Sequence, residues 1–380
     1  MARARKQQMK NGGLTVRLLI CAGGTGGGVY PALAVHSALT ARRPNVETLW
    51  VGGEGGMEEE LVKHAGIPFQ SIPAAGVHGV GLRVLPGNLA RLGRGVLASG
   101  RILREFKPDV LFFTGGYVAG PMAFAGRALP TLLYVPDIEP GLAIKTVARF
   151  ADRIAVTAVD SKKYFPPRKN VVATGYPLRA DLSGWSRQKA IQRFGLSGKL
   201  PVLLVFGGSK GARSINQAVT ANLSALLEIA EVIHITGALD WPSIEPTVQE
   251  LSATLAKRYH VMPYLHEMGA ALAAADLVLS RAGASSLGEF PLFGLPAILV
   301  PYPHAWRYQK VNADMLARNG AAIALEDQYL KDRLLLLVKE LFDNPAKRQA
   351  MRAAMQSLAK PEAAAAIASQ LIELAGETPL

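Results

Sequence analysis

The chain has 380 residues, 49% of them hydrophobic and 19% charged, a length that exceeds one ordinary hydrophobic core and a composition that excludes a disordered protein. Residues 1–180 carry 23 basic and 11 acidic side chains (+12) and residues 181–380 carry 19 and 18 (+1), so the first half holds nearly all of the net charge of +13. The sequence has no apolar run of about eighteen residues that could span a membrane, and its single cysteine, Cys21, excludes an internal disulfide, so we expect a protein of the reducing cytoplasm.

Apolar runs rich in β-branched residues alternate along the first half with segments of helical periodicity. These runs predict strands at 16–22, 46–52, 110–116, 131–137 and 153–158. Helices are predicted from about Pro31, near Met57 to Ala65 and from about Pro121.

Residues 80–107 combine arginines with leucines in the pattern of a basic amphipathic surface. Such a surface can rest on anionic lipid headgroups, and an ordinary packed pair of helices is the alternative. Several glycines and Pro86 argue against one long helix in this segment. The basic side chains are Arg83, Arg91, Arg94, Arg101, Arg104 and Lys107.

The second half repeats the alternation of strands and helices. Strands are predicted at 201–209, 231–237, 260–265, 277–283 and 296–302, with helices from about Ala212, over Met268 to Ala274 and from about Ser285. Strands that are apolar on nearly every residue belong to parallel sheets with helices on both faces. We therefore predict an α/β protein made of two facing Rossmann-like domains.

Three strand-to-helix turns are rich in glycine: GGTGGG at 23–28, TGGYVAGP at 114–121 and GGSKGAR at 207–213. Glycine lets backbone N–H groups approach an anion, and the following helix directs its positive end at the same place. Because ligands of such folds bind at the carboxyl ends of strands, these turns predict phosphorylated ligands. The dinucleotide pattern fails at Val29 and no P-loop motif is present, which disfavours hydride transfer and P-loop hydrolysis.

Six motifs carry a resemblance to a known family. They are GGTGGGVYPALAV at 23–35, GGYVAGP at 115–121, GYPLR at 175–179, GGSKGAR at 207–213, RAGASSLGE at 281–289 and PYPHAWRYQKVNA at 301–313. In order and spacing they resemble the MurG-type glycosyltransferases of family 28, over about residues 16–375. The resemblance implies the GT-B fold, with domains at 14–180 and 200–358 and a C-terminal helix within 359–380 that crosses back toward the first domain.

The same resemblance implies an activity and a location. Enzymes of this type transfer N-acetylglucosamine, with inversion, from UDP-N-acetylglucosamine to a polyprenyl-diphosphate-linked muramyl peptide, the step from lipid I to lipid II in peptidoglycan precursor synthesis. They act on the cytoplasmic face of the cell membrane as peripheral proteins. The expected partners are therefore the UDP-sugar, the lipid-linked acceptor and, through the basic first domain, an anionic membrane surface, with no nucleic acid.

The resemblance assigns the donor site mainly to the second domain. Arg179 is expected near the nucleotide, Glu289 on both ribose hydroxyls, and Gln309 on the sugar, whereas Tyr308 replaces a second sugar-binding glutamine. From the residues alone, Ser285 can be only a helix cap, Arg179 a surface residue and Glu289 the partner of a cation such as Arg281. The predicted donor set is Arg179, Ser209, Lys210, Gly211, Leu265, Ala284, Ser285, Ser286, Glu289 and Gln309.

The first domain departs from the family pattern. Gly28 stands where the family has a histidine that is a candidate for acceptor activation, and YVPD at 134–137 replaces the family's HEQN. The acceptor diphosphate is expected on the backbone of the two glycine-rich turns of this domain. These residues are Thr25, Gly26, Gly27, Gly28, Gly115, Gly116 and Tyr117.

An inverting transfer needs a base that takes the proton of the acceptor hydroxyl, and a group that stabilises the departing diphosphate. Arg179 and helix N-termini are expected to do the second. For the first, Asp137 is the leading candidate because it follows a predicted strand, with Glu139, Tyr117 and His78 as weaker ones. A turn-forming role before Pro140 is the alternative for Asp137.

The remaining polar residues suggest no metal site. No cluster has metal-ligand spacing and no D-x-D motif is present, so we expect donor binding without a protein-held metal and no cofactor besides the UDP-sugar substrate. His36 and His234 are expected to be structural. Two alternatives stay open: a transferase with a different lipid or glycan acceptor, and an inactive UDP-sugar-binding homologue or an epimerase of the same architecture.

Overall fold

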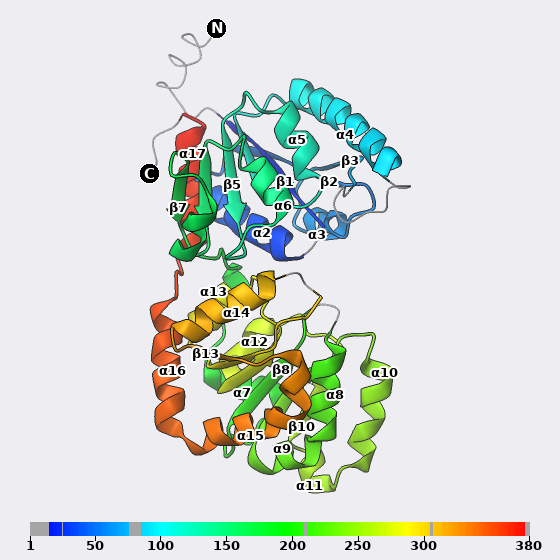
Figure 1. Ribbon diagram of the computed structural model, residues 1–380, viewed down its shortest axis with the longest axis vertical. Coiled ribbons are helices and arrows are strands. Elements are labelled where there is room, and N and C mark those ends of the chain that lie inside the picture. Colours follow the sequence, from blue (N-terminus) through cyan, green and yellow to red (C-terminus); the bar gives the residue numbers. More distant parts are fainter. Residues whose placement is uncertain (1–14, 25, 76–84, 209–210, 305–306, 377–380) are drawn as a thin grey trace. The chain divides into compact units, whose positions relative to one another are not determined.

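The computed structural model describes residues 15–24, 26–75, 85–208, 211–304 and 307–376 (Figure 1). These residues divide into two compact units. Unit 1 comprises the described residues up to Arg179 together with those from Pro361 onward, and unit 2 runs from Ala180 to Lys360. Each unit is built on one sheet whose paired strands are all parallel, so the predicted α/β class is confirmed.

Unit 1 contains a seven-stranded sheet in the order β3-β2-β1-β4-β5-β6-β7. The strands are β1 (Val16–Ala22), β2 (Val46–Gly53), β3 (Phe69–Ile72), β4 (Val110–Gly115), β5 (Thr131–Val135), β6 (Arg153–Val156) and β7 (Asn170–Ala173). β1 and β4 are hydrogen-bonded neighbours. The two glycine-rich turns that follow them therefore lie side by side at the carboxyl edge of the sheet.

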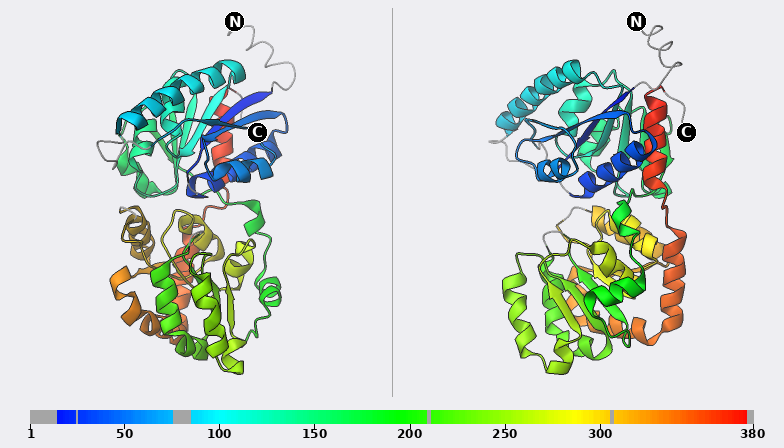
Figure 2. Two further views of the ribbon diagram at one scale, coloured as in Figure 1. Left: turned by 90° about the vertical axis from the view of Figure 1, so that its right-hand side faces the viewer. Right: turned by 180° about the vertical axis from the view of Figure 1, so that it is seen from behind.

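Helices cover both faces of this sheet (Figures 1 and 2). They are α2 (Gly26–Arg42), α3 (Glu58–His64), α4 (Leu85–Phe106), α5 (Ala119–Ala125), α6 (Leu142–Val147) and α17 (Ala363–Leu374), with a 3₁₀ turn η1 (Val159–Tyr164). α4, α5 and α6 place Ile102, Met122 and Val147 in one core cluster with the sheet. α17, from the end of the chain, packs against α2. Arg42 donates to Ser369 at 2.9 Å and Arg153 pairs with Glu373 at 2.6 Å, which ties α17 to unit 1.

Residues 85–106 of the basic segment form one helix of 22 residues, α4, so the expectation that glycines and Pro86 interrupt it is wrong; Arg83 lies outside the described residues. Pro86 lies in the first turn, where its missing N–H would have no partner within the helix. Gly95 is required by packing, because a Cβ there would lie 2.3 Å from the carbonyl oxygen of Pro73. The glycine thus lets α4 pack closely on the body of unit 1.

Unit 2 contains a six-stranded sheet in the order β10-β9-β8-β11-β12-β13. The strands are β8 (Val202–Phe206), β9 (Glu231–Ile235), β10 (Tyr259–Met262), β11 (Leu277–Ser280), β12 (Ala297–Leu299) and β13 (Ala322–Ala324). The helices are α7 (Arg187–Phe194), α8 (Arg213–Ala221), α9 (Leu223–Ile229), α10 (Trp241–Ile244), α11 (Ala253–Ala256), α12 (Met268–Ala274), α13 (Ser286–Phe293), α14 (Tyr308–Arg318), α15 (Leu330–Asp343) and α16 (Pro345–Ser357), with 3₁₀ turns η2 (Ala180–Leu182), η3 (Glu245–Glu250) and η4 (Asp327–Tyr329).

The apolar pattern does not predict β3, β7 or β13. Each of these strands lies at the edge of its sheet and is partly exposed. β3 and β7 carry polar residues that a buried strand would exclude, whereas β13 is only three residues long.

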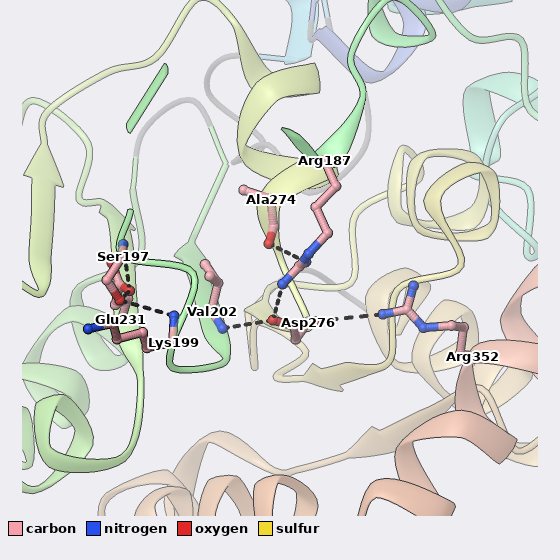
Figure 3. A network of polar contacts seen from close by, with 8 residues as sticks. All are labelled: Arg187, Ser197, Lys199, Val202, Glu231, Ala274, Asp276 and Arg352. Carbon is pink, nitrogen blue, oxygen red and sulfur yellow. Dashed lines mark hydrogen bonds and ion pairs between the residues drawn. The ribbon is translucent and has the colours of Figure 1, made fainter. Parts of the chain in front are cut away.

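Polar contacts fix the amino-terminal edge of the unit 2 sheet (Figure 3). Asp276, just before β11, accepts the backbone N–H of Val202 at 2.9 Å and pairs with Arg187 at 2.8 Å. Arg187 also donates to the carbonyl of Ala274 at 2.7 Å, which links α7 to α12. Nearby, the buried Glu231 at the start of β9 accepts the backbone N–H of Ser197 at 2.9 Å. This edge is structural, and the opposite edge carries the loops of the donor motifs.

Candidate functional site

The two glycine-rich turns of unit 1 are in backbone contact. Gly24 and Gly116 both have positive φ angles, +85° and +89°. A Cβ on Gly116 would lie 2.6 Å from the carbonyl oxygen of Gly23, so only glycine fits there. Thr114 donates its hydroxyl to the carbonyl of Gly28 at 2.7 Å. The structure therefore brings Gly26, Gly27 and Gly28, which open α2, next to Gly115 and Gly116; Thr25 lies outside the described residues.

The candidate bases of unit 1 differ in exposure. Asp137 is half-buried just after β5, Tyr117 is 62% exposed beside Gly116, and Glu139 is only 3% exposed. β5 is the neighbour of β4, so Asp137 follows the strand next to the glycine turn. A 3%-exposed carboxyl presents little surface to a substrate, which favours Asp137 over Glu139. His78 lies outside the described residues.

Tyr134 occupies the first position of the YVPD segment and is fully buried. Its hydroxyl hydrogen-bonds Thr157 at 2.7 Å. Burial raises the pKa of Tyr134 well above its ordinary value, and the negative charge of Asp137 acts in the same direction. Tyr134 is therefore a structural phenol and not a proton acceptor, and it supports the backbone that presents Asp137.

Arg179, predicted near the nucleotide, belongs to unit 1. Its guanidinium lies over the ring of Tyr30 in α2, 4.9 Å from the ring centroid. A guanidinium stacked on an aromatic face keeps its N–H edge available for hydrogen bonds in the plane. The arginine is thus held by a side chain that follows the first glycine turn by two residues.

The glycine turn of unit 2 contacts the end of the neighbouring strand. Gly211 has φ +77°, and a Cβ there would lie 2.2 Å from the carbonyl oxygen of Thr236, just after β9. Its N–H donates to the carbonyl of Gly208 at 2.9 Å, which closes the turn. Ser209 and Lys210, both predicted donor residues, lie outside the described residues. The flanking backbone is nevertheless of the glycine-only kind that anion-binding turns use.

The turn before α13 contains three predicted donor residues, Ala284, Ser285 and Ser286. Ser285 is the N-cap residue but makes no side-chain cap hydrogen bond, so its hydroxyl does not serve as a helix cap. Ser286 is 2% exposed and donates its hydroxyl to the carbonyl of Gly283 at 2.6 Å. Its backbone N–H bonds the same residue at 3.0 Å. Ser286 therefore shapes the turn, whereas Ser285 and the half-buried Glu289 are nearer the surface.

Two further donor residues lie on the loops that follow β10 and β12. Leu265 is 8% exposed, between the exposed Tyr264 and His266. Gln309, in the first turn of α14, accepts the backbone N–H of Tyr302 on its side-chain oxygen at 2.9 Å. Because that oxygen is engaged, Gln309 presents its NH₂ group as the donor for a ligand.

Arg281, expected from the sequence only as a possible partner of Glu289, bonds several loops of unit 2. Its side chain is 9% exposed and pairs with Asp327 at 2.5 Å. It also donates to the Ser214 hydroxyl at 2.8 Å and to the carbonyl of Val300 at 3.1 Å. One guanidinium therefore joins the ends of β11 and β12 with the first turn of α8. The arginine of RAGASSLGE was visible in the sequence, but its partners are distant along the chain.

A second network supports the glycine turn of unit 2 from within. Asn216 of α8 donates to the carbonyl of Thr236 at 2.8 Å and to Asp240 at 2.9 Å, and its side-chain oxygen bonds His234 at 3.0 Å. His234 is fully buried and also bonds the Tyr259 hydroxyl at 2.9 Å. Burial lowers the pKa of His234 to about 3, so it is neutral. The structural role predicted for His234 is confirmed.

The part of the chain that the structure describes offers neither a cluster of metal ligands nor a membrane-spanning helix. Among these residues, no group of three or more His, Cys, Asp or Glu side chains is arranged to hold a metal ion. No helix among them has both the length and the apolar character to cross a bilayer.

Comparison with known families decides the assignment. The model of the glycosyltransferase family 28 N-terminal domain matches residues 18–156, and that of the C-terminal domain matches residues 202–369. The chain belongs to glycosyltransferase family 28. These matched ranges contain both glycine-rich edges described above.

Curated relatives in family 28 match nearly the whole chain. One from Desulforudis audaxviator (strain MP104C) is 40% identical over 373 residues, covering 95% of this chain and 99% of the relative. One from Roseiflexus sp. (strain RS-1) is 38% identical and covers 93% of this chain and 94% of the relative. Both are named UDP-N-acetylglucosamine–N-acetylmuramyl-(pentapeptide) pyrophosphoryl-undecaprenol N-acetylglucosamine transferase.

Solved structures agree with the family and with the predicted two-domain fold. The crystal structure of Acinetobacter baumannii MurG aligns with a TM-score of 0.74 at 27% identity, over 94% of this chain and 99% of that one. A UDP-N-acetylglucosamine 2-epimerase aligns with a TM-score of 0.66 at 14% identity, over 96% of this chain and 98% of that one. At that identity the epimerase shares the fold alone.

Proposed function

We propose that this chain transfers N-acetylglucosamine from UDP-N-acetylglucosamine to an N-acetylmuramyl-(pentapeptide) pyrophosphoryl-polyprenol, with inversion at the anomeric carbon. The observation that carries the proposal is the similarity, at 40% and 38% identity over nearly the full length, to relatives named for this reaction. Family membership and the glycine-rich turns at the carboxyl edges of both sheets support it. The product would be the lipid II type of peptidoglycan precursor.

The donor would bind at the carboxyl edge of unit 2. Gly211 has no Cβ, so the chain can pass close to Thr236 and its backbone can approach a diphosphate closely. The Arg281 guanidinium, fixed by Asp327 and by Ser214 in the first turn of α8, would hold the loops that meet a departing UDP. Gln309, whose NH₂ group points away from its bond to Tyr302, would donate to a sugar hydroxyl. The remaining predicted donor contacts are those of Leu265, Ala284, Ser285 and Glu289, with Arg179 from unit 1.

The acceptor would bind at the carboxyl edge of unit 1. Its diphosphate would lie on the turn that opens α2 and on the neighbouring turn of Gly115 and Gly116. Asp137 would take the proton of the acceptor hydroxyl as its oxygen attacks the anomeric carbon and UDP leaves. Tyr134, fixed by Thr157, supports the position of this carboxylate. The UDP-sugar is a substrate, and the proposal requires no further cofactor.

The exposed side of α4 supports action at a membrane. Arg94, Leu97, Arg101 and Arg104 are all exposed and recur at helical spacing, with Leu97 76% exposed. Phe124 of the adjacent α5 is 50% exposed. A surface that combines arginines with exposed apolar side chains suits anionic lipid headgroups on the cytoplasmic face of a membrane. Binding to anionic vesicles, weakened by Leu97→Glu and absent with neutral vesicles, tests this contact.

A different lipid or glycan acceptor is the second candidate, and one observation favours it. A Cβ on Gly28 would meet Thr114 at 3.4 Å, an ordinary contact, so local packing does not impose glycine where the family has histidine. The absent imidazole therefore favours an acceptor that differs from that of the family.

The test uses the purified protein with radiolabelled UDP-N-acetylglucosamine and a short-chain polyprenyl-diphosphate muramyl pentapeptide. We expect one sugar on each acceptor and an equal amount of UDP. Transfer only to polyprenyl diphosphates that lack the muramyl peptide would favour the second candidate. Hydrolysis of the UDP-sugar, or its conversion to the C2 epimer, without transfer to any acceptor would contradict both.

A further inference from the structure

Glu58 is a buried charged residue that the proposed reaction does not use. It begins α3, it is 1% exposed, and its carboxylate is bonded to backbone. Oε1 accepts the N–H of Gly53 at 2.9 Å and Oε2 accepts the N–H of Gly24 at 3.1 Å. The side chain therefore joins the end of β2 to the glycine turn that follows β1.

Three glycines make the space for this carboxylate. A Cβ on Gly23 would lie 2.2 Å from Oε1, a Cβ on Gly56 2.3 Å, and a Cβ on Gly52 2.9 Å. None of these three glycines has a positive φ, so their backbone conformations do not require glycine. The absence of side chains at Gly23 and Gly56 is instead explained by the carboxylate, and that at Gly52 by the Phe69 ring, 2.6 Å from the Cβ position, together with the carboxylate.

The carboxylate also acts on the second turn. It holds the N–H of Gly24, and the preceding Gly23 is the residue whose carbonyl oxygen Gly116 approaches. Trp50 supports the same point, because its indole N–H donates to the carbonyl of Ala22 at 2.9 Å. The position of Gly23 and Gly24, set by Glu58, thus determines where Gly116 lies.

We infer that Glu58 is a positioning residue for the acceptor diphosphate, an inference that rests on the proposed function. It does not contact the substrate, because both of its oxygens are engaged by backbone and the side chain is 1% exposed. Because Glu58 accepts the N–H of Gly24, that N–H does not donate to a bound anion. The diphosphate is therefore left to the N–H groups at the start of α2, which a helix N-terminus directs outward.

Two variants remove the interaction in different ways. Glu58→Gln keeps the size of the side chain but offers one oxygen in place of two, so one of the two N–H groups loses its acceptor. Gly56→Ala leaves Glu58 intact but displaces its carboxylate by the contact of 2.3 Å. For each we expect the KM of the acceptor to rise roughly tenfold, as for one lost hydrogen bond to a charged group, and the KM of UDP-N-acetylglucosamine to stay within about twofold.

Each variant has a matched control. Asp109→Asn alters a carboxylate that accepts the N–H of Arg17 at 2.9 Å, the same kind of bond at the other end of β1. Gly53→Ala adds the same methyl group where its nearest neighbour would be Glu58 Oε1 at an ordinary 3.8 Å. Both controls should keep the acceptor KM of the parent. An unchanged acceptor KM in the folded Glu58→Gln and Gly56→Ala proteins, or an equal rise in the controls, overturns the inference.

A second readout does not depend on activity. Amide hydrogen exchange should accelerate in the peptide that contains Gly24 for Glu58→Gln and Gly56→Ala, and not for the two controls. If the parent protein transfers no sugar, the proposed function fails while exchange still reports on the role of Glu58 in the turn. If exchange at Gly24 is unchanged in both variants, the inference about Glu58 fails whatever the activity.

Discussion

The glycine turn after β1 in unit 1 rests on a carboxylate, whereas the turn after β8 in unit 2 rests on an amide, a neutral imidazole and the ion pair of Arg281 with Asp327. In unit 1, Glu58 takes the N–H of Gly24, and Asp137 follows a nearby strand. In unit 2, Asn216 and the neutral His234 hold the strand end that Gly211 contacts, and the buried Arg281 reaches the first turn of α8. Two turns with similar sequences are thus supported by different groups, a carboxylate that accepts backbone N–H groups in unit 1 and ion pairs with an amide network in unit 2.

The difference matches the two halves of a glycosyl transfer. A base must accept a proton from the acceptor, which suits Asp137 of unit 1, and the leaving diphosphate needs hydrogen-bond donors, which suits the glycine turn of unit 2. The groups around the glycine turn of unit 1 also differ in charge from the rest of that half of the chain. Residues 1–180 carry a balance of +12, yet the glycine turn after β1 is bonded by the carboxylate of Glu58, and the exposed Arg94, Arg101 and Arg104 lie on α4.

The largest effect is expected from removing the proposed base. Asp137→Asn should lower the rate of transfer roughly 10²- to 10⁴-fold, because the acceptor hydroxyl then keeps its proton, with little change in donor KM. Single-turnover transfer measures this. Asp152→Asn is the matched control, since Asp152 accepts the N–H of Thr131 at 2.9 Å at the other end of β5. Transfer by Asp137→Asn at the parent rate would contradict the role of Asp137 as the base.

The next largest effect is expected from removing Arg281 of unit 2. Arg281→Ala leaves Asp327 and two backbone carbonyls without their buried partner, which should cost about 3 kcal/mol of unit 2 stability and raise the donor KM. Arg213→Ala removes an arginine that is 72% exposed and pairs with Asp240, and should cost less than about 1 kcal/mol. Urea unfolding compares the two. Equal losses would show that Arg281 has no special structural role.

Acid should weaken unit 2 through His234. Its pKa is lowered to about 3 in the folded chain from an ordinary 6.5, so between these values the unfolded state binds the extra proton and stability falls as pH falls. From pH 7 to pH 5 the parent should lose about 2 kcal/mol more than His234→Gln, which cannot titrate but retains hydrogen-bonding groups. If the parent and His234→Gln lose the same stability between pH 7 and pH 5, His234 is not kept neutral in the folded protein.

The smallest effect is expected at Gly28. A Cβ there makes only ordinary contact with Thr114, and alanine favours the first turn of α2 more than glycine does. Gly28→Ala should therefore stabilise the protein by about 0.5–1 kcal/mol, measured by thermal unfolding. A clear loss of stability would mean that glycine at this position is required by packing.

The sequence predicts the fold where strands are buried and fails where they are exposed. The apolar run 16–22 coincides with β1. The edge strands β3 and β7 are not predicted because their exposure permits polar residues, and β13 is not predicted because it has only three residues. α4 is missed as one helix because the reason for Gly95, its approach to Pro73, lies in tertiary packing. Helix propensity cannot register a contact between distant segments.

The residues of the candidate site also divide into those that the sequence reveals and those that only the fold reveals. The glycine turns are visible in the sequence because their residues are contiguous. Glu58, Asn216 and Arg281 are not recognised as supports, because each acts on a loop that is remote along the chain. Their residue types are ordinary for a helix or a strand end, so only the folded geometry identifies the bonds they make.

The assignment of the donor to the glycine turn of unit 2, and of the acceptor to the turns of unit 1, is tested most directly by calorimetry. The measurement is the binding of UDP-N-acetylglucosamine to a matched pair of variants. Gly211→Ala and Gly116→Ala each add a methyl group at a positive φ, 2.2 Å and 2.6 Å from a backbone carbonyl oxygen. With both proteins folded, Gly211→Ala should weaken binding at least roughly tenfold, as expected for loss of backbone contacts to a diphosphate, and Gly116→Ala should leave it within about twofold. Weaker binding by Gly116→Ala, with Gly211→Ala equal to the parent, would contradict the assignment of donor and acceptor to units 2 and 1.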